Sequence, residues 1–219
     1  LNHSVFDPFQ AVFPKHKLQT TWSVLDKKLR IVGVDGSHPG KDSGELTEAN
    51  YRSIEKILLS DPHRPTLVLS HFPVTEEAAL TNAGQRPFIY NKKDSMRLQR
   101  LFQKAPGVFF MAAGHTHRAH RDAPDLPGGP QFAQFCATTP FPGGFTLMDF
   151  YEDGYTVTFH RTPTAQALAQ TAFNRYDKSF GFYGEYTVSR MQDRCFTVKK
   201  DMSALCLLYT SDAADDSLR

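Results

Sequence analysis

The fold of this chain is decided at residues 108–118, Val-Phe-Phe-Met-Ala-Ala-Gly-His-Thr-His-Arg. The apolar first half is typical of a buried strand, and Gly114 then turns the backbone. His115 and His117 follow at positions i and i+2, and in an extended segment this spacing places both rings on the same side of the chain. Neutral imidazole is the commonest protein ligand for zinc-like and iron-like metals. The stretch therefore predicts metal ligands at the end of a strand.

A second apolar run ends in the same way. Thr66–Ser70 also has the composition of a buried strand, and His71 follows it directly. In open α/β sheets, ligands gather at the carboxyl ends of the strands. We therefore expect His71, His115 and His117 to share one site.

Strands and helices alternate around these two runs. Thr47 is a candidate helix N-cap, with apolar residues at helical spacing after it and Asp61-Pro62 as the stop signal. The expected elements are strands over 21–25 and 29–35 joined by a hairpin turn, a loop over 36–44, a helix from residue 48, a strand over 66–70, a long polar loop through residue 86, a helix over 94–104 and a strand over 108–111. This order is typical of an α/β layered domain.

After Pro130 the pattern changes to shorter strands. Strands are expected over 132–137, 144–150 and 155–160, followed by a helix over 165–174 with Leu168 and Phe173 facing inward. The stretch from Phe182 to Val198 is expected to form two more short strands. The aromatic residues after Arg175 are interpreted as core rather than as substrate-stacking groups; they are Tyr176, Phe180, Phe182, Tyr183 and Tyr186.

Composition excludes several classes of function. A net charge of +2 favours neither a nucleic-acid nor a membrane partner. No apolar run approaches the roughly 20 residues that span a bilayer. The three cysteines, Cys136, Cys195 and Cys206, form no Cys-x-x-Cys pair, so we interpret them as small hydrophobic residues rather than disulfide or thiolate-metal partners.

We expect one domain over residues 1–205, ending in a β-rich extension. Residues 206–219 continue no helical or strand period, and they resemble the translation of a sequencing adapter. They are therefore expected to be a non-native tail and are excluded from the interpretation of the fold. With Leu1 at the start, this predicts that the chain is a fragment of a longer protein.

The histidine motifs carry a resemblance to a known family. Asn2-His3, then Ser70-His71-Phe72-Pro73, then Gly114-His115-Thr116-His117 occur in the order of the calcineurin-like metallophosphoesterases. The resemblance covers most of residues 1–161, and Gly44-Glu45-Leu46-Thr47 is similar to the class III cyclic-nucleotide phosphodiesterases of that superfamily. It implies the C-terminal portion of a layered αββα sandwich fold and hydrolysis of a phosphoester substrate, most specifically a phosphodiester.

The resemblance also implies a role for each matching residue. Asn2, His71 and His115 would bind one metal of a dinuclear centre, and His117 would bind the other. His3 would protonate the leaving oxygen or hold the phosphate, as imidazole can. A donor set of histidine, asparagine and aspartate suits manganese, iron or zinc. Two such ions activate a water and neutralise phosphoryl oxygens.

This sequence departs from the family pattern in three places. Leu1 stands where the family has glycine, and Ser4 stands where it has an acidic residue that would orient His3. The upstream Asp-x-His and Gly-Asp blocks, which supply the bridging carboxylate, are absent from the sequence. We therefore expect the chain as given to bind metal weakly and to turn over little phosphoester.

Other readings stay open beside this one. A metallophosphoesterase scaffold used for protein binding, or a structural site for one zinc ion, would also explain the histidines. His120 is three residues past His117 and is interpreted as a solvated loop residue rather than a further ligand. Asp35 follows a buried strand and is expected to cap the loop at Gly36 and Ser37.

Overall fold

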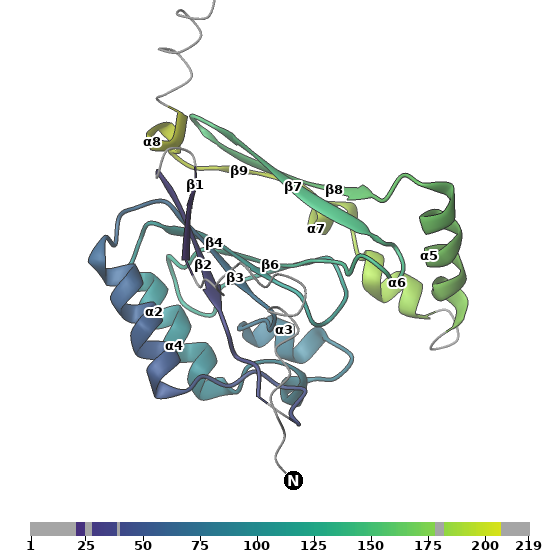
Figure 1. The fold of residues 1–219 in the computed structure, drawn as a ribbon, viewed down its shortest axis with the longest axis horizontal. Coiled ribbons are helices and arrows are strands. Elements are labelled where there is room, and N and C mark those ends of the chain that lie inside the picture. The colour runs from purple at the N-terminus through teal and green to yellow at the C-terminus, as the bar shows by residue number, and fades with distance from the viewer. Residues whose placement is uncertain (1–20, 25–27, 39, 178–181, 207–219) are drawn as a thin grey trace, which may run out of the picture.

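The computed structural model describes residues 21–24, 28–38, 40–177 and 182–206, and the fold below refers to these parts of the chain. Asn2, His3 and residues 207–219 lie outside them. The larger of two β-sheets has six strands in the order β1-β2-β3-β4-β6-β5 (Figure 1). Its strands are β1 (Thr21–Val24), β2 (Leu29–Val34), β3 (Thr66–Ser70), β4 (Val108–Ala113), β5 (His120–Asp122) and β6 (Gln131–Gln134).

The four central strands of this sheet, β2, β3, β4 and β6, run parallel. The two edge strands, β1 and β5, are antiparallel to their neighbours. The antiparallel pairing of β1 with β2 confirms the predicted hairpin. Every residue of β4 is buried, which explains why its sequence is continuously apolar rather than alternating.

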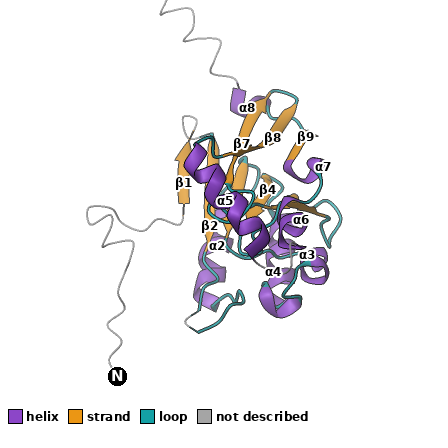
Figure 2. Cartoon of the chain, turned by 90° about the vertical axis from the view of Figure 1, so that its right-hand side faces the viewer, coloured by secondary structure: helices purple, strands orange, loops and turns teal. Residues whose placement is uncertain are grey.

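The second sheet has three antiparallel strands, β7 (Gly144–Tyr151), β8 (Gly154–Arg161) and β9 (Cys195–Lys199). The helices are α2 (Glu48–Ser60), α3 (Glu76–Thr81), the 3-10 turn η1 (Arg86–Phe88), α4 (Lys92–Lys104), α5 (Ala165–Asp177), α6 (Phe182–Val188), α7 (Met191–Arg194) and α8 (Ser203–Cys206). In the side view of Figure 2, the second sheet lies at one end of the molecule, and α2, α3 and α4 lie toward the other.

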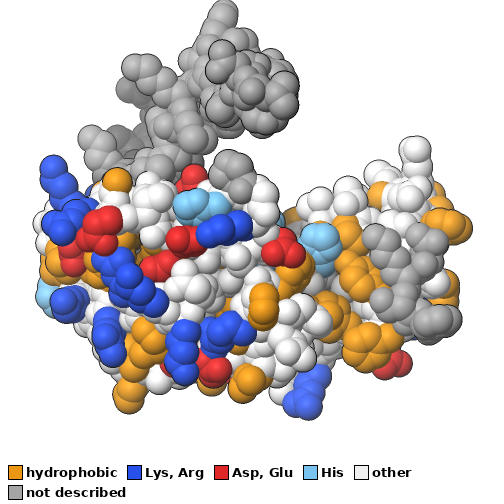
Figure 3. Space-filling model, turned by 90° about the horizontal axis from the view of Figure 1, so that it is seen from below, with side chains coloured by type: hydrophobic (Ala, Val, Ile, Leu, Met, Phe, Trp, Pro, Cys, Tyr) orange, Lys and Arg blue, Asp and Glu red, His pale blue; other side chains and the backbone are white. Residues whose placement is uncertain are grey.

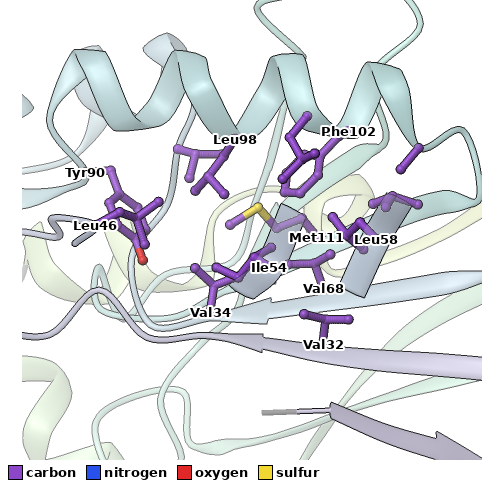
Figure 4. Close-up of a cluster of buried hydrophobic side chains, with 14 of the residues drawn as sticks. Val32, Val34, Leu46, Ile54, Leu58, Val68, Tyr90, Leu98, Phe102 and Met111 are labelled. Carbon is purple, nitrogen blue, oxygen red and sulfur yellow. The ribbon is translucent and has the colours of Figure 1, made fainter. Parts of the chain in front are cut away.

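One hydrophobic core lies between the large sheet and the helices α2 and α4. Figure 4 shows Leu98 and Phe102 of α4 above the sheet residues, and Ile54 and Leu58 of α2 among them. The sheet contributes Val32, Val34, Val68, Val108, Met111 and Phe132. The apolar positions of both helices recur every three or four residues, so each helix buries one stripe against the sheet.

A second core lies between the two sheets. Phe110 of β4 is fully buried there, and its ring centroid is 5.8 Å from that of Tyr155 on β8. The ring of Phe196 on β9 stacks on the Phe110 ring, with the two centroids 6.4 Å apart. The molecule therefore has a helix layer, a sheet and a second sheet in succession, which confirms the predicted α/β layered class.

Arg30 joins helix α2 to the sheet within the core. It is 3% exposed, and its guanidinium donates to the carbonyl oxygens of Ile57 at 2.6 Å and Asp61 at 2.9 Å. Its Nε also donates to Thr66 Oγ1 at 3.0 Å. The last carbonyls of a helix have no partner within it, so this side chain caps the C-terminal end of α2.

The prediction of one long polar loop through residue 86 is wrong, because α3 lies within that segment and η1 begins at its last residue. Thr75 caps α3 by accepting a hydrogen bond from the Ala78 amide at 3.1 Å. Glu76 and Glu77 occupy its first turn, where carboxylates favour a helix. The N-cap residue and the acidic first turn are sequence features from which this short helix could have been predicted.

The C-terminal expectations also need correction. The predicted pair of strands over 182–198 is wrong, because α6 and α7 precede the single strand β9. Phe173 was expected to face inward but is 67% exposed. Tyr176 and Phe182 are also largely exposed, so the interpretation of all these aromatic residues as core is wrong for them. Phe180 lies outside the described residues.

The surface has no uniform character. In Figure 3, charged side chains of both signs gather on one side of the face, and hydrophobic side chains gather on the side where Figure 1 places α5 and α6. On the second sheet, Phe145, Leu147 and Tyr151 of β7 are each about half exposed. Within the described part of the chain, no helix combines the length and the apolar character needed to cross a membrane.

Candidate functional site

The candidate site lies at the carboxyl ends of two adjacent parallel strands. His71 follows β3, and Gly114 follows β4, its neighbour in the sheet. The Gly114 amide donates to the His71 carbonyl oxygen at 3.0 Å, so the two loops are joined directly. This is the edge at which open α/β sheets bind their ligands.

His71 and His115 face each other across this junction. His71 Nε2 and His115 Nδ1 are 2.9 Å apart, and the ring centroids are 4.8 Å apart at 67°. Burial lowers the pKa of His115, and the neighbouring His71 lowers it further. His115 is therefore biased toward the neutral form, which is the form in which imidazole binds metal.

Aromatic packing fixes the position of the His115 ring. The centroid of the Phe88 ring lies 4.0 Å from it, and that of Phe72 lies 4.5 Å from it. The second ring nitrogen, His115 Nε2, is buried. The ring is thus clamped with one nitrogen directed at His71.

The donor pair fits a metal ion such as zinc. Zinc lies about 2.0–2.1 Å from an imidazole nitrogen, so two ligand nitrogens of one ion are separated by about 2.9 Å at a right angle and about 3.4 Å at the tetrahedral angle. The facing nitrogens of His71 and His115 are 2.9 Å apart, which matches the right-angle separation and is shorter than the tetrahedral one. Two neutral imidazoles also suit manganese or iron.

His117 lies at the same hollow but makes a different contact. His71, His115 and His117 all line a hollow of about 400 Å³, together with Cys136 and Thr138. His117 Nδ1 lies 3.1 Å from the hydroxyl oxygen of Tyr183 on α6. Among the described residues, no three His, Cys, Asp or Glu side chains come together closely enough to hold a metal ion. The structure thus joins His71 with His115 and sets His117 beside them.

The extended backbone expected for the Gly-His-x-His segment is wrong. The φ angles of His115 and His117 are 64° and 56°, in the left-handed region. Thr116 between them is buried and donates to Gln134 Oε1 at 2.7 Å. The segment is a tight turn around this threonine, since the Thr116 amide reaches the Gly114 carbonyl at 2.7 Å.

Two further predictions concern residues near the site. Asp35 accepts a hydrogen bond from the Ser37 amide at 2.9 Å, which confirms its role as a loop cap. His120 is not the solvated loop residue that was expected. It lies on β5, is half-buried, and its Nδ1 is 2.9 Å from Asp122 Oδ1. It lines a second, polar hollow with Glu77 and Arg118.

Tyr183 and Cys136 line or contact the site and were not predicted there. Tyr183 is separated from His117 by 66 residues, and no local pattern marked it as more than an aromatic residue of the C-terminal segment. Burial raises the pKa of Tyr183, so its phenol stays protonated near neutral pH. Burial also raises the pKa of the Cys136 thiol to about 11, which leaves it neutral and a poor metal ligand.

Comparisons with known proteins give structural likenesses alone. No protein-family model and no curated protein matches the chain. Among solved structures, the chain is similar to the crystal structure of a dimetal phosphatase from Danio rerio, with 21% sequence identity and a TM-score of 0.42. The match covers 53% of this chain and 36% of that phosphatase. At this identity and TM-score, the likeness assigns neither a family nor an activity to the chain.

Proposed function

We propose that this chain carries part of the metal site of a metal-dependent phosphoester hydrolase, with a phosphodiester as its most specific substrate class. The observation that carries the proposal is the contact between His71 Nε2 and His115 Nδ1 at 2.9 Å, at the carboxyl edge of the parallel sheet. The order of the histidine motifs in the sequence, which resembles that of calcineurin-like metallophosphoesterases, supports it independently.

Each residue has a proposed role at this site. His71 and His115 hold one divalent ion of manganese, iron or zinc, and a nitrogen of each ring already faces the other ring. Asn2 is a further ligand of that ion, and His117 is a ligand of a second ion. Asn2 and His3 lie outside the described residues. When bound, such ions lower the pKa of a water and neutralise phosphoryl oxygens. His3 protonates the leaving oxygen.

The first test removes one half of the histidine pair. We expect His115→Ala and His71→Gln each to lower the affinity for manganese or zinc by more than about 100-fold, since even the loss of a group that only orients a ligand costs 10- to 100-fold. The measurements are metal content after equilibrium dialysis, and hydrolysis of a bis-aryl phosphate with excess metal. Hydrolysis by the unmutated chain is expected to be slow and to fall to background in both variants.

The matched control is His160→Ala. His160 lies on β8, where its ring stacks on Phe145 at 5.5 Å, in the other sheet from the histidine pair. It should leave metal content unchanged, and circular dichroism should show that all three variants fold. Unchanged metal binding in both site variants would overturn the proposal. No metal binding and no hydrolysis in the unmutated chain would favour the protein-binding scaffold instead.

A further inference from the structure

Gln134 is the last residue of β6 and lies beside the strand from which the histidine turn departs. Its backbone pairs with β4 on one side and with β5 on the other. Its side chain is fully buried and accepts a hydrogen bond from Thr116 Oγ1 at 2.7 Å. We propose that Gln134 is a positioning residue that holds Thr116 and thereby fixes the turn that presents His115 to His71. The consequence for metal binding rests on the proposed function; the positioning of the turn does not.

The neighbours of Gln134 decide which way its amide points. Arg118 Nε lies 3.1 Å from Oε1, and a guanidinium nitrogen only donates, so the atom that faces it is the amide oxygen. The amide nitrogen then faces Asp122, whose two carboxylate oxygens lie 2.8 and 2.9 Å from it. Because Oε1 carries no hydrogen, Thr116 supplies the hydrogen of their 2.7 Å contact. The donor and the acceptor of each of these hydrogen bonds are therefore assigned.

This network of four side chains is anchored outside the turn. The Arg118 guanidinium also donates to the carbonyl oxygen of Thr81 at 2.9 Å and to its hydroxyl oxygen at 2.7 Å, at the end of α3. Arg118, Asp122 and Gln134 are all buried. A buried polar group that loses its partner costs free energy, so the network favours the one arrangement in which all its members are paired.

The turn connects this network to the histidine pair. The Gly114 amide donates to the His71 carbonyl oxygen at 3.0 Å, and the Thr116 amide reaches the Gly114 carbonyl oxygen at 2.7 Å. The Thr116 hydroxyl is 3.3 Å from that same carbonyl oxygen, which is a longer contact than the one to Gln134. The left-handed backbone at His115 persists only while its surroundings hold it. Loss of the Gln134 contact should therefore loosen the turn and the facing of the two rings.

Hydrogen exchange in the metal-free full chain tests the positioning of the turn. Gln134→Leu removes the acceptor of the Thr116 hydroxyl. We expect the amides of Gly114 and Thr116 to exchange about tenfold faster relative to the amides of β4, as for the loss of one buried hydrogen bond. Exchange of these two amides at the rate of the unmutated chain would overturn the inference.

Gln99→Leu is the matched control. Gln99 on α4 is also buried, and it donates to the Val74 carbonyl oxygen at 3.0 Å and to Asp125 Oδ2 at 2.7 Å. Its loss removes a comparable set of hydrogen bonds from another part of the core and should leave exchange in the histidine turn unchanged. If both variants accelerate that exchange equally, the cause is a general loss of stability, and the positioning role of Gln134 is refuted.

A double variant tests the assigned direction of the network. Gln134→Glu alone keeps an oxygen for Thr116 and Arg118 but places a second carboxyl oxygen against Asp122, so exchange in the turn should accelerate. Adding Asp122→Asn restores a donor opposite an acceptor without changing the summed charge of the two side chains. Exchange in the double variant should return to within about twofold of the unmutated chain. Exchange as fast as in Gln134→Glu would overturn the inference.

Thr116→Val decides the question if circular dichroism shows that Gln134→Leu does not fold. Valine keeps the branched shape of threonine and removes only the hydroxyl. We expect the Gly114 amide to exchange about tenfold faster in this variant, because the same hydrogen bond is lost from its other end. An unchanged rate would refute the role of the Thr116–Gln134 contact.

Zinc titration separates this inference from the proposed function. By isothermal calorimetry, Gln134→Leu should bind zinc 10- to 100-fold more weakly than the unmutated chain, as for the loss of a group that orients a ligand, and Gln99→Leu should bind equally well. Equal affinity in Gln134→Leu would overturn the metal-binding consequence while leaving the proposed function intact. If the unmutated chain binds no zinc, the proposed function fails together with that consequence, and hydrogen exchange alone decides the positioning of the turn.

Discussion

The backbone at His115 and His117 has a conformation that L-amino acids rarely adopt. Their φ angles of 64° and 56° are left-handed, and each costs about 1–2 kcal/mol relative to ordinary backbone. Strain of this kind persists only where the surroundings hold it in place. Here the buried Thr116 between them anchors the turn through Gln134. A strained turn, rather than an extended strand, therefore sets the directions of the two rings.

Tyr90 gives a prediction for alkaline pH. Its side chain is fully buried. Burial raises the pKa of this phenol to about 12. The unfolded chain releases this proton near pH 10. The stability that the protonated Tyr90 gives to the folded state is therefore fully present below pH 10 and is lost as the pH rises toward about 12.

We expect Tyr90→Phe to reduce this alkaline loss. At neutral pH the stability of the variant should change by no more than about 1 kcal/mol, because the hydroxyl that is removed has at most one side-chain partner, Ser70. The full loss attributable to Tyr90 is about 2.7 kcal/mol for a shift of about two pKa units. Urea unfolding at several pH values measures it, with the half-exposed Tyr151→Phe as control. Parallel pH curves for the Tyr90 variant and the unmutated chain would contradict the prediction.

At the scale of elements, helix α2 begins at the N-cap that its local sequence predicts. Its predicted cap is present, since Thr47 Oγ1 accepts from the Asn50 amide at 3.1 Å. We expect Thr47→Ala to cost about 1 kcal/mol, because the amide loses its only side-chain acceptor. Ser53→Ala, at an exposed position inside the same helix, should change stability by at most a few tenths of a kcal/mol. Equal urea midpoints for the two variants would refute the role of the cap.

The elements that were predicted and those that were missed differ in length and packing. The helices α2 and α4 are 13 residues long, so their apolar stripes repeat often enough to be recognised. The helix α3 has six residues and α7 has four, which is too short for a period to show. The exposed Phe173 misled the prediction for α5, because an aromatic residue at helical spacing normally faces the core.

At the scale of the whole molecule, the two sheets share one core. Phe110 is fully buried between them, with Phe135, which follows β6, stacked on it at 6.1 Å and Tyr155 of β8 edge-on at 5.8 Å. We expect Phe110→Ala to lower the free energy of unfolding by about 3–5 kcal/mol, because a large cavity opens in a packed interior. Phe173→Ala, at a residue 67% exposed, should have almost no effect.

Calorimetry and urea unfolding measure this prediction. Because the sheets are joined by a common core, the unmutated chain should unfold in one transition, with a calorimetric enthalpy equal to the van't Hoff enthalpy. Two separate transitions would show that the second sheet folds independently of the first. If Phe110→Ala lowers the free energy of unfolding by less than about 1 kcal/mol, the core around Phe110 must collapse into the space that the ring leaves.

The sequence by itself determined the alternation of strands and helices, the burial of β4 and the location of His71 and the Gly-His-x-His motif at strand ends. Each of these depends on neighbours within a few residues, through apolar periodicity and glycine turns. Tertiary structure alone decided that His71 meets His115, that the histidine turn is left-handed and that Tyr183 reaches His117. Those features depend on contacts across 44 and 66 residues, and on a backbone strain that only the packed core sustains.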